Sequence, residues 1–79
     1  MEKDEQEYKK FLEDQLEWSK EQARILDKID RRLREMKTIA EYARDLDLSL
    51  SEREKLNREF DQLKEEIQLL EKKMQSNVH

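Results

Sequence analysis

Glycine, proline and cysteine are all absent from the 79 residues of this chain. The turns of sheets and compact loops commonly use glycine, which reaches positive φ, or proline, whose φ is preset. Their absence argues against a β-sheet protein and favours long helices joined by a short connection. Without cysteine the chain can form neither a disulfide framework nor a thiolate metal site.

Long apolar runs are also missing, since no more than two apolar residues follow one another. A membrane-spanning helix needs about 20 such residues, and the apolar part of a secretory signal needs about 7–15. We therefore expect no membrane interaction and a cytoplasmic protein, although export without a cleaved signal would leave the same pattern.

Charged side chains dominate what is present: they make up 48% of the chain, against 34% apolar and 6% aromatic residues. The 17 basic and 21 acidic groups nearly cancel, leaving a net charge of −4. A small net charge with regularly spaced apolar residues indicates a coiled coil rather than a disordered chain. Chains below roughly 70–80 residues seldom close a self-sufficient core, so we expect one domain that oligomerises.

The second half of the chain has the most regular pattern, with apolar residues alternately four and three positions apart. Such a heptad repeat puts one apolar seam on one side of a helix, where it packs knobs into holes. The predicted seam consists of Leu56, Phe60, Leu63, Ile67, Leu70 and Met74.

A capping box marks the start of this second helix. Ser51 and Glu54 have the required spacing, and Ser49 with Glu52 offers the same chemistry two residues earlier. With Ser51 and Glu54 as the cap, the helix is predicted over about residues 52–75, followed by a frayed tail at 76–79.

The first half predicts one long helix over about residues 3–45, because no helix breaker interrupts it. Its share of the hairpin core is predicted as Leu26, Ile29, Leu33, Met36, Ala40 and Ala43. Residues 46–51 would connect the two helices. The predicted fold is all-α: residues 1–79 form a two-helix antiparallel coiled-coil hairpin with a long first helix, which dimerises into a four-helix assembly.

The two predicted helices differ in length, and this difference leaves the start of the first one uncovered. At 1.5 Å per residue they span roughly 65 and 36 Å, so the second helix folds back only to about Glu21 or Gln22. The uncovered stretch contains several apolar side chains, and an exposed stripe of that size normally marks an interface. A frayed tail with incidental aromatic residues is the alternative. The predicted interface consists of Tyr8, Phe11, Leu12, Leu16 and Trp18.

Charge is distributed unevenly along the chain. Residues 1–19 carry a net charge of −4, residues 20–44 carry +3 and residues 45–79 carry −3. In an antiparallel dimer the acidic start of one chain would lie beside the basic middle of the other. Exposed ion pairs contribute little each, so charge would select the orientation and apolar burial would supply the affinity.

Residues for catalysis, cofactors or metals are not evident. The single histidine is the terminal residue, His79, where order is least expected. Neither a cysteine nucleophile, a serine with a histidine partner nor a glycine-rich phosphate loop is present. We therefore predict no catalytic residues, no metal site, no cofactor and no enzymatic activity.

One basic cluster raises the alternative of nucleic-acid binding. Lys28, Arg31 and Arg34 are three residues apart, so they can share a helix face and contact phosphates. Asp27 and Asp30 lie among them, however, and the chain as a whole is acidic rather than basic. Pairing with nearby carboxylates is the preferred interpretation, which makes nucleic acid a disfavoured partner.

A family resemblance covers roughly residues 26–70. Residues 33–43 read LREMKTIAEYA, Leu48 and Ser49 follow in the connection, and Arg53 leads into LNREFDQLKEEI at residues 56–67. This resembles the amino-terminal helical core of bacterial flagellin. The resemblance implies a bacterial helical hairpin that packs against other helices. The terminal helices that polymerise the flagellar filament have no counterpart, and Leu46 and Asp47 stand where the family has Asn-Gly.

The sequence therefore predicts a small non-enzymatic helical protein that associates with itself and presents helix faces to another helical protein, in a structural, adaptor or regulatory role. A nucleic-acid-associated accessory factor is one alternative. A flagellin-related assembly component is the other, and it depends on the resemblance alone.

Overall fold

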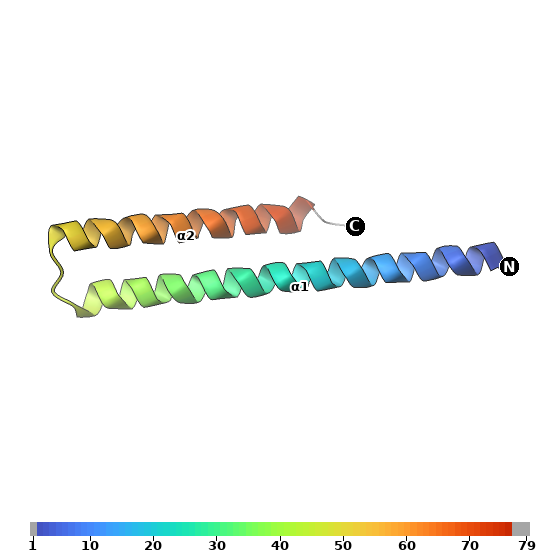
Figure 1. The fold of residues 1–79 in the computed structure, drawn as a ribbon, viewed down its shortest axis with the longest axis horizontal. Coiled ribbons are helices and arrows are strands. Elements are labelled where there is room, and N and C mark those ends of the chain that lie inside the picture. The colour runs from blue at the N-terminus through green and yellow to red at the C-terminus, as the bar shows by residue number, and fades with distance from the viewer. Residues whose placement is uncertain (1, 77–79) are drawn as a thin grey trace.

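The computed structural model describes residues 2–76, which form an antiparallel pair of helices. Helix α1 (Glu2–Asp45) and helix α2 (Leu50–Ser76) lie side by side, and α1 extends well beyond the end of α2 (Figure 1). The predicted all-α hairpin with a long first helix is confirmed. Ser76, expected in the tail, is the last residue of α2, and the rest of that predicted tail, including His79, lies outside the described residues.

Local charge pairing supports α1 over its whole length. Acidic residues occupy its first turn and Arg44 its last, which matches the sign of the helix dipole at each end. Opposite charges four residues apart add further pairs along the surface. These pairs are Lys9–Glu13 at 4.0 Å, Asp27–Arg31 at 2.9 Å, Asp30–Arg34 at 3.0 Å and Lys37–Glu41 at 3.9 Å.

The connection reverses the chain without a left-handed residue, since no described residue has positive φ. Helix α1 ends with Leu46 N–H donating to the Tyr42 carbonyl at 3.2 Å. Residues 47–49 have no regular structure, and among these three residues Leu48 is half-buried. The turn therefore needs no glycine.

Ser49, not Ser51, caps α2. The backbone N–H of Glu52 donates to Ser49 Oγ at 3.2 Å, and Ser49 Oγ donates to the Glu52 carboxylate at 3.1 Å. The predicted cap at Ser51 and Glu54 is wrong, because α2 already begins at Leu50 and both residues lie inside its first turns. The capping motif has the predicted spacing of three residues, but it is formed by Ser49 and Glu52, two residues before the predicted pair.

The cap gives a direct test of this boundary. We expect Ser49→Ala to lower the free energy of unfolding by about 0.5–2 kcal/mol, because the Glu52 N–H loses its acceptor. Ser51→Ala is the matched control and should change stability much less. Urea unfolding followed by circular dichroism measures both, and a larger loss from Ser51→Ala would contradict the assignment.

The apolar seam between the helices differs from the predicted one on the α1 side. Half-buried or buried positions of the α1 seam alternate three and four residues apart. They are Gln15, Trp18, Gln22, Ile25, Ile29, Arg32, Met36, Ile39 and Ala43, and Glu21 is half-buried beside them. On α2 the seam positions are the six residues from Leu56 to Met74 named above, and Glu59 is half-buried beside them. Ile29, Met36 and Ala43 thus lie in the seam, but every second residue of the predicted α1 seam is displaced by one position.

Leu26, Leu33 and Ala40 are therefore not core residues of the hairpin, contrary to the prediction. Leu26 is 53% exposed and Leu33 is 51% exposed, and Ala40 is also exposed. The neighbouring Ile25, Arg32 and Ile39 face α2 instead. The apolar stripe of α1 is wider than one helix can cover, so its two edges compete for α2 and only one is buried.

The resulting core is very small. Among the described residues the buried apolar side chains are Ile25, Leu63 and Ile67, at 1%, 9% and 8% exposure. Two helices without a third layer leave most of each surface in water, so these side chains carry much of the stability.

Removal of the most buried side chain should therefore be costly. Ile25→Ala is expected to destabilise the hairpin by about 2–5 kcal/mol, through lost burial and the cavity left behind. Leu69→Ala, on the outer face of α2, removes an exposed side chain and should change little. Thermal unfolding of the two variants side by side measures the difference, and equal losses would contradict the seam.

Candidate functional site

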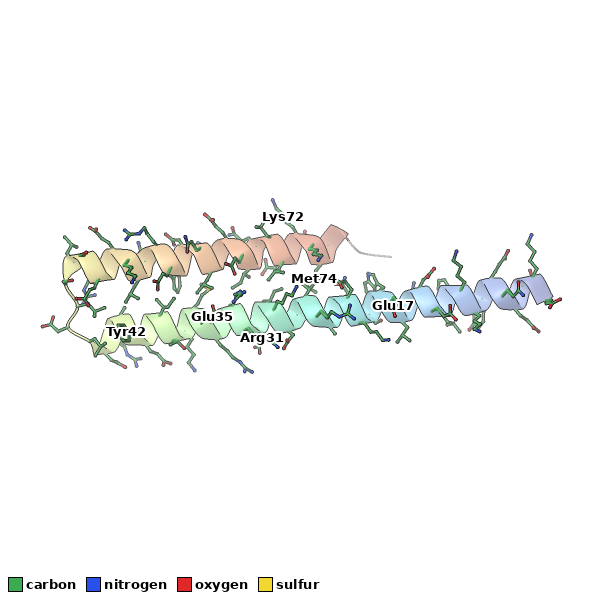
Figure 2. All side chains as sticks on the ribbon, in the orientation of Figure 1. Glu17, Arg31, Glu35, Tyr42, Lys72 and Met74 are labelled. Carbon is green, nitrogen blue, oxygen red and sulfur yellow. The ribbon has the colours of Figure 1, made fainter. Side chains whose placement is uncertain are left out.

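The uncovered start of α1, residues 2–17, is the overhang. The ion pair between Lys73 Nζ and Glu21 Oε1, at 3.3 Å, marks the region where α2 ends beside α1. Figure 2 places Met74 near that end and Glu17 beyond it, at the beginning of the overhang. No described residue of α2 therefore lies beside most of the overhang.

The overhang presents the apolar side chains that the sequence singled out. Tyr8, Phe11, Leu12 and Leu16 are all exposed, Tyr8 to 64%. Trp18, predicted to belong to the same interface, is half-buried and lies in the seam instead. The four exposed residues are thus a candidate docking surface, with Trp18 at its border.

Two of these side chains continue the line of the seam. Tyr8 and Phe11 precede Gln15 and Trp18 by the same alternating steps that the buried seam follows. They consequently face the side on which α2 would lie if it were longer. The apolar pattern of α1 is therefore longer than the helix that covers it.

A second apolar line runs along one edge of α1 and is here called the open flank. It consists of Leu12, Leu26, Leu33 and Ala40, which are exposed and fall seven or fourteen residues apart. Ser19 occupies the remaining position of this line. Because a spacing of seven returns to the same side of a helix in a coiled coil, these side chains form one stripe.

The opposite edge of the hairpin is closed by ion pairs between the helices. Arg32 Nε donates to Glu66 at 2.7 Å and Lys73 pairs with Glu21, while Arg32 Nη1 also donates at 2.9 Å to Glu35 on its own helix. Glu21 and Glu35 lie on the far side of the seam from Leu26 and Leu33 by helical spacing. The hairpin thus has one ionic edge and one apolar edge.

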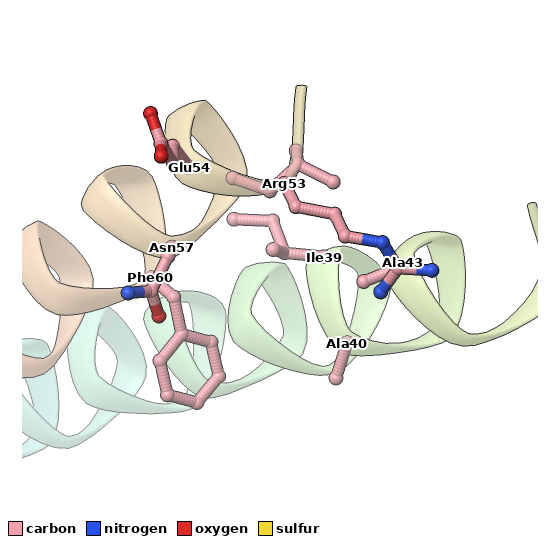
Figure 3. Close-up of a pocket in the computed structure, with 8 residues that line it drawn as sticks. Ile39, Ala40, Ala43, Arg53, Glu54, Asn57 and Phe60 are labelled. Carbon is pink, nitrogen blue, oxygen red and sulfur yellow. The ribbon is translucent and has the colours of Figure 1, made fainter. Parts of the chain in front are cut away.

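Near the connection the open flank continues into a groove between the helices (Figure 3). Ala40 and Ala43 leave space on the α1 side, Phe60 forms part of the α2 side, and the side chain of Arg53 extends toward Ala43. Ile39, Glu54, Leu56 and Asn57 complete the lining. The groove is therefore mainly apolar, with one cation, Arg53, and one carboxylate, Glu54, in its lining.

Ion pairing changes the acidity of one carboxyl group at the end of the hairpin. Hydrogen bonds from Lys73, and next from Arg24, hold the pKa of Glu21 below its ordinary value of 4.5. A lowered pKa in the folded chain means that the ionised form stabilises it. This stabilisation is present above the unfolded pKa and is lost as the pH falls through the folded value.

Because the pKa of Glu21 is lowered in the folded chain, the stability lost in Glu21→Gln should depend on pH. We expect wild type to melt above the variant at pH 7 and the difference to disappear below pH 4.5, as the carboxyl group becomes protonated. Lys73→Met, which removes the cation, should reduce the same difference. Thermal melts between pH 3 and 7 measure it, and a difference that is unchanged at pH 3 would be the contrary result.

The proposed phosphate-binding cluster is already occupied by carboxylates. Arg31 pairs with Asp27 at 2.9 Å and Arg34 with Asp30 at 3.0 Å, whereas Lys28 is simply exposed. Arg31 points away from α2 (Figure 2). A phosphate would have to displace two internal ion pairs, which weakens the case for nucleic acid.

Several residues of the interface between the helices were missed by the sequence reasoning. Ile25, Ile39 and Arg32 belong to the seam, and Gln22 lies there with its Nε2 atom buried and without a hydrogen-bond partner among the described residues. The steps of four and three that start at Trp18 contain the signal. Gln22 and Arg32 conceal it, because polar residues do not count toward an apolar repeat.

Comparison with protein-family models, curated proteins and solved structures found no match. Within residues 2–76, no helix is long and apolar enough to cross a membrane, and no group of three or more histidine, cysteine or acidic residues is arranged to hold a metal ion. The overhang, the open flank and the groove are the surfaces on which a partner could pack.

Proposed function

We propose that this chain is a non-enzymatic helical protein that acts by self-association, forming an antiparallel dimer of hairpins, and by presenting helix faces to other proteins. The observation that carries the proposal is the imbalance between burial and exposure. Three apolar side chains are buried among the described residues, whereas ten large ones are exposed. Exposed apolar stripes of this extent are typical of interfaces.

The accessible surface supports the same conclusion. The chain exposes 6853 Å², whereas a compact monomer of its mass would expose about 5200 Å². The surplus of about 1700 Å² exceeds the roughly 800 Å² that each partner buries in an interface of standard size. A second helical layer can therefore be accommodated without unfolding the hairpin.

The elongated shape of the hairpin also supports self-association. The radius of gyration is 20.0 Å and the molecule measures 71 × 18 × 10 Å, whereas a compact domain of this length has a radius of about 12 Å. A rod one helix thick over the length of the overhang cannot shield its apolar side chains by itself. Another helix packed against the overhang would bury them.

Removal of the overhang aromatics tests the proposal. We expect wild type to sediment as a dimer at tens of micromolar and the double variant Tyr8→Ser, Phe11→Ser to sediment as a monomer. The two aromatic side chains would be buried only in the dimer, so their removal weakens the dimer and not the hairpin. Leu69→Ser, which changes an equally exposed residue on the outer face of α2, is the matched control and should remain dimeric.

Circular dichroism of the same samples distinguishes dissociation from unfolding. The double variant should keep the helical signal of the hairpin core, which lies outside the overhang. A wild-type protein that sediments as a folded monomer at these concentrations would refute the proposal.

A further inference from the structure

We propose that the overhang of one chain docks along the open flank and into the groove of a second copy, so that Leu12 faces Leu33 and Tyr8 enters the groove beside Ala40 and Phe60. The two α1 helices would run antiparallel with their two-fold axis near Gln22, and α2 of each copy would form the outer layer. This arrangement rests on the proposed self-association and specifies which surfaces meet.

Spacing is the first argument for this register. Leu12, Leu26, Leu33 and Ala40 all lie on one stripe of α1. When two such stripes meet antiparallel with Leu12 opposite Leu33, Ser19 comes opposite Leu26 and Glu5 opposite Ala40, all at the same time. One two-fold contact thus covers Leu12, Leu26 and Leu33 of both copies, as an isologous interface requires.

Charge selects a second copy as the occupant and the antiparallel direction. The overhang carries seven acidic and three basic side chains. Residues 24–40, which it would cover, carry six basic and three acidic ones. Two overhangs packed on each other, or two parallel α1 helices, would instead bring the acidic segments together, which disfavours both arrangements.

Burial of a polar atom is the third argument. Gln22 Nε2 has no hydrogen-bond partner among the described residues although it is buried, and an unpaired buried donor is costly. With the two-fold axis near Gln22, Ser19 and Gln22 of the second copy lie next to this amide. A rotation of the side chain toward the open flank would supply the missing acceptor.

The groove accounts for the far end of the overhang. Ala40 and Ala43 provide room for an aromatic ring, and Phe60 provides a ring to pack against it. Arg53 at the rim makes no ion pair among the described residues, while the first turn of α1 contributes Glu2, Asp4 and Glu5. In the proposed register those carboxylates reach the Arg53 side of the groove.

Site-specific cross-linking tests the register, and the absence of cysteine makes it clean. Leu12→Cys combined with Leu33→Cys, treated with a short bismaleimide, should become a covalent dimer. Within one chain these positions are about 32 Å apart along α1, so the link must join two copies. Leu12→Cys alone should stay uncross-linked. In the proposed register the Leu12 positions of the two copies are also about 32 Å apart, which a short reagent cannot span.

The mass of each variant before cross-linking separates the two proposals. A dimer in which Leu12→Cys alone cross-links, and the pair shows no additional cross-link, would mean that the overhangs pack on each other; it overturns this register and leaves self-association standing. A wild-type monomer overturns both. A dimer with neither cross-link also overturns the register.

A charge exchange provides a second readout without altering the apolar contacts. Arg53→Glu should weaken the dimer by roughly 5- to 20-fold, because the symmetric complex contains two copies of each contact. Adding Glu5→Arg should restore much of the affinity if these groups meet. Sedimentation at several concentrations measures both, and an Arg53→Glu protein of unchanged affinity would contradict the placement of the overhang in the groove.

Discussion

Two helices can bury only the side chains that lie between them, and this constraint governs the whole molecule. A sheet covered by helices or a bundle of four buries several rows of side chains, but a hairpin buries one seam. In this chain the seam has few fully buried residues, although apolar residues continue along α1 in two further directions. One direction is past the end of α2, and the other is around the helix onto the open flank. Both kinds of exposure follow from the single limited interface.

Polar residues inside the seam limit its stability and can fix its alignment. Arg32 occupies a seam position between Ile29 and Met36, is half-buried and directs its guanidinium group to Glu66 on α2. A shift of one heptad in one direction would replace Glu66 by Lys73 and set two cations against each other, whereas the opposite shift would bring Glu59 instead. Arg32 therefore disfavours one of the two neighbouring registers while giving up apolar burial.

The sequence predicted the fold because helix formation depends on local features that are complete in this chain: no breaker within either helix, a regular heptad in α2 and a capping motif. It also located the overhang, because helix length follows directly from residue number. It misplaced half of the α1 seam, since Leu26 and Ile25 are equally apolar and only the position of α2 decides between them. The cap was ambiguous between Ser49 and Ser51 for the same reason, because both motifs have correct local chemistry. The resemblance to flagellin stays a prediction, since no family, relative or structure matches the chain.

The displaced seam also changes what the leucines of α1 imply. If Leu26 and Leu33 had packed against α2, the overhang would have been the main apolar surface left, and a partner would have needed to cover only the first four turns of α1. Because Ile25, Arg32 and Ile39 face α2 instead, the exposed line extends from Leu12 to Ala40 along nearly the whole helix. A surface of that length matches another helix as long as α1 itself. The acidic overhang of one copy would pair with the basic middle of α1 in the other, which favours an antiparallel arrangement. The uneven helix lengths and the wide stripe on α1 are thus parts of one pattern, in which each half of α1 lacks the cover that the other half of a second copy can provide.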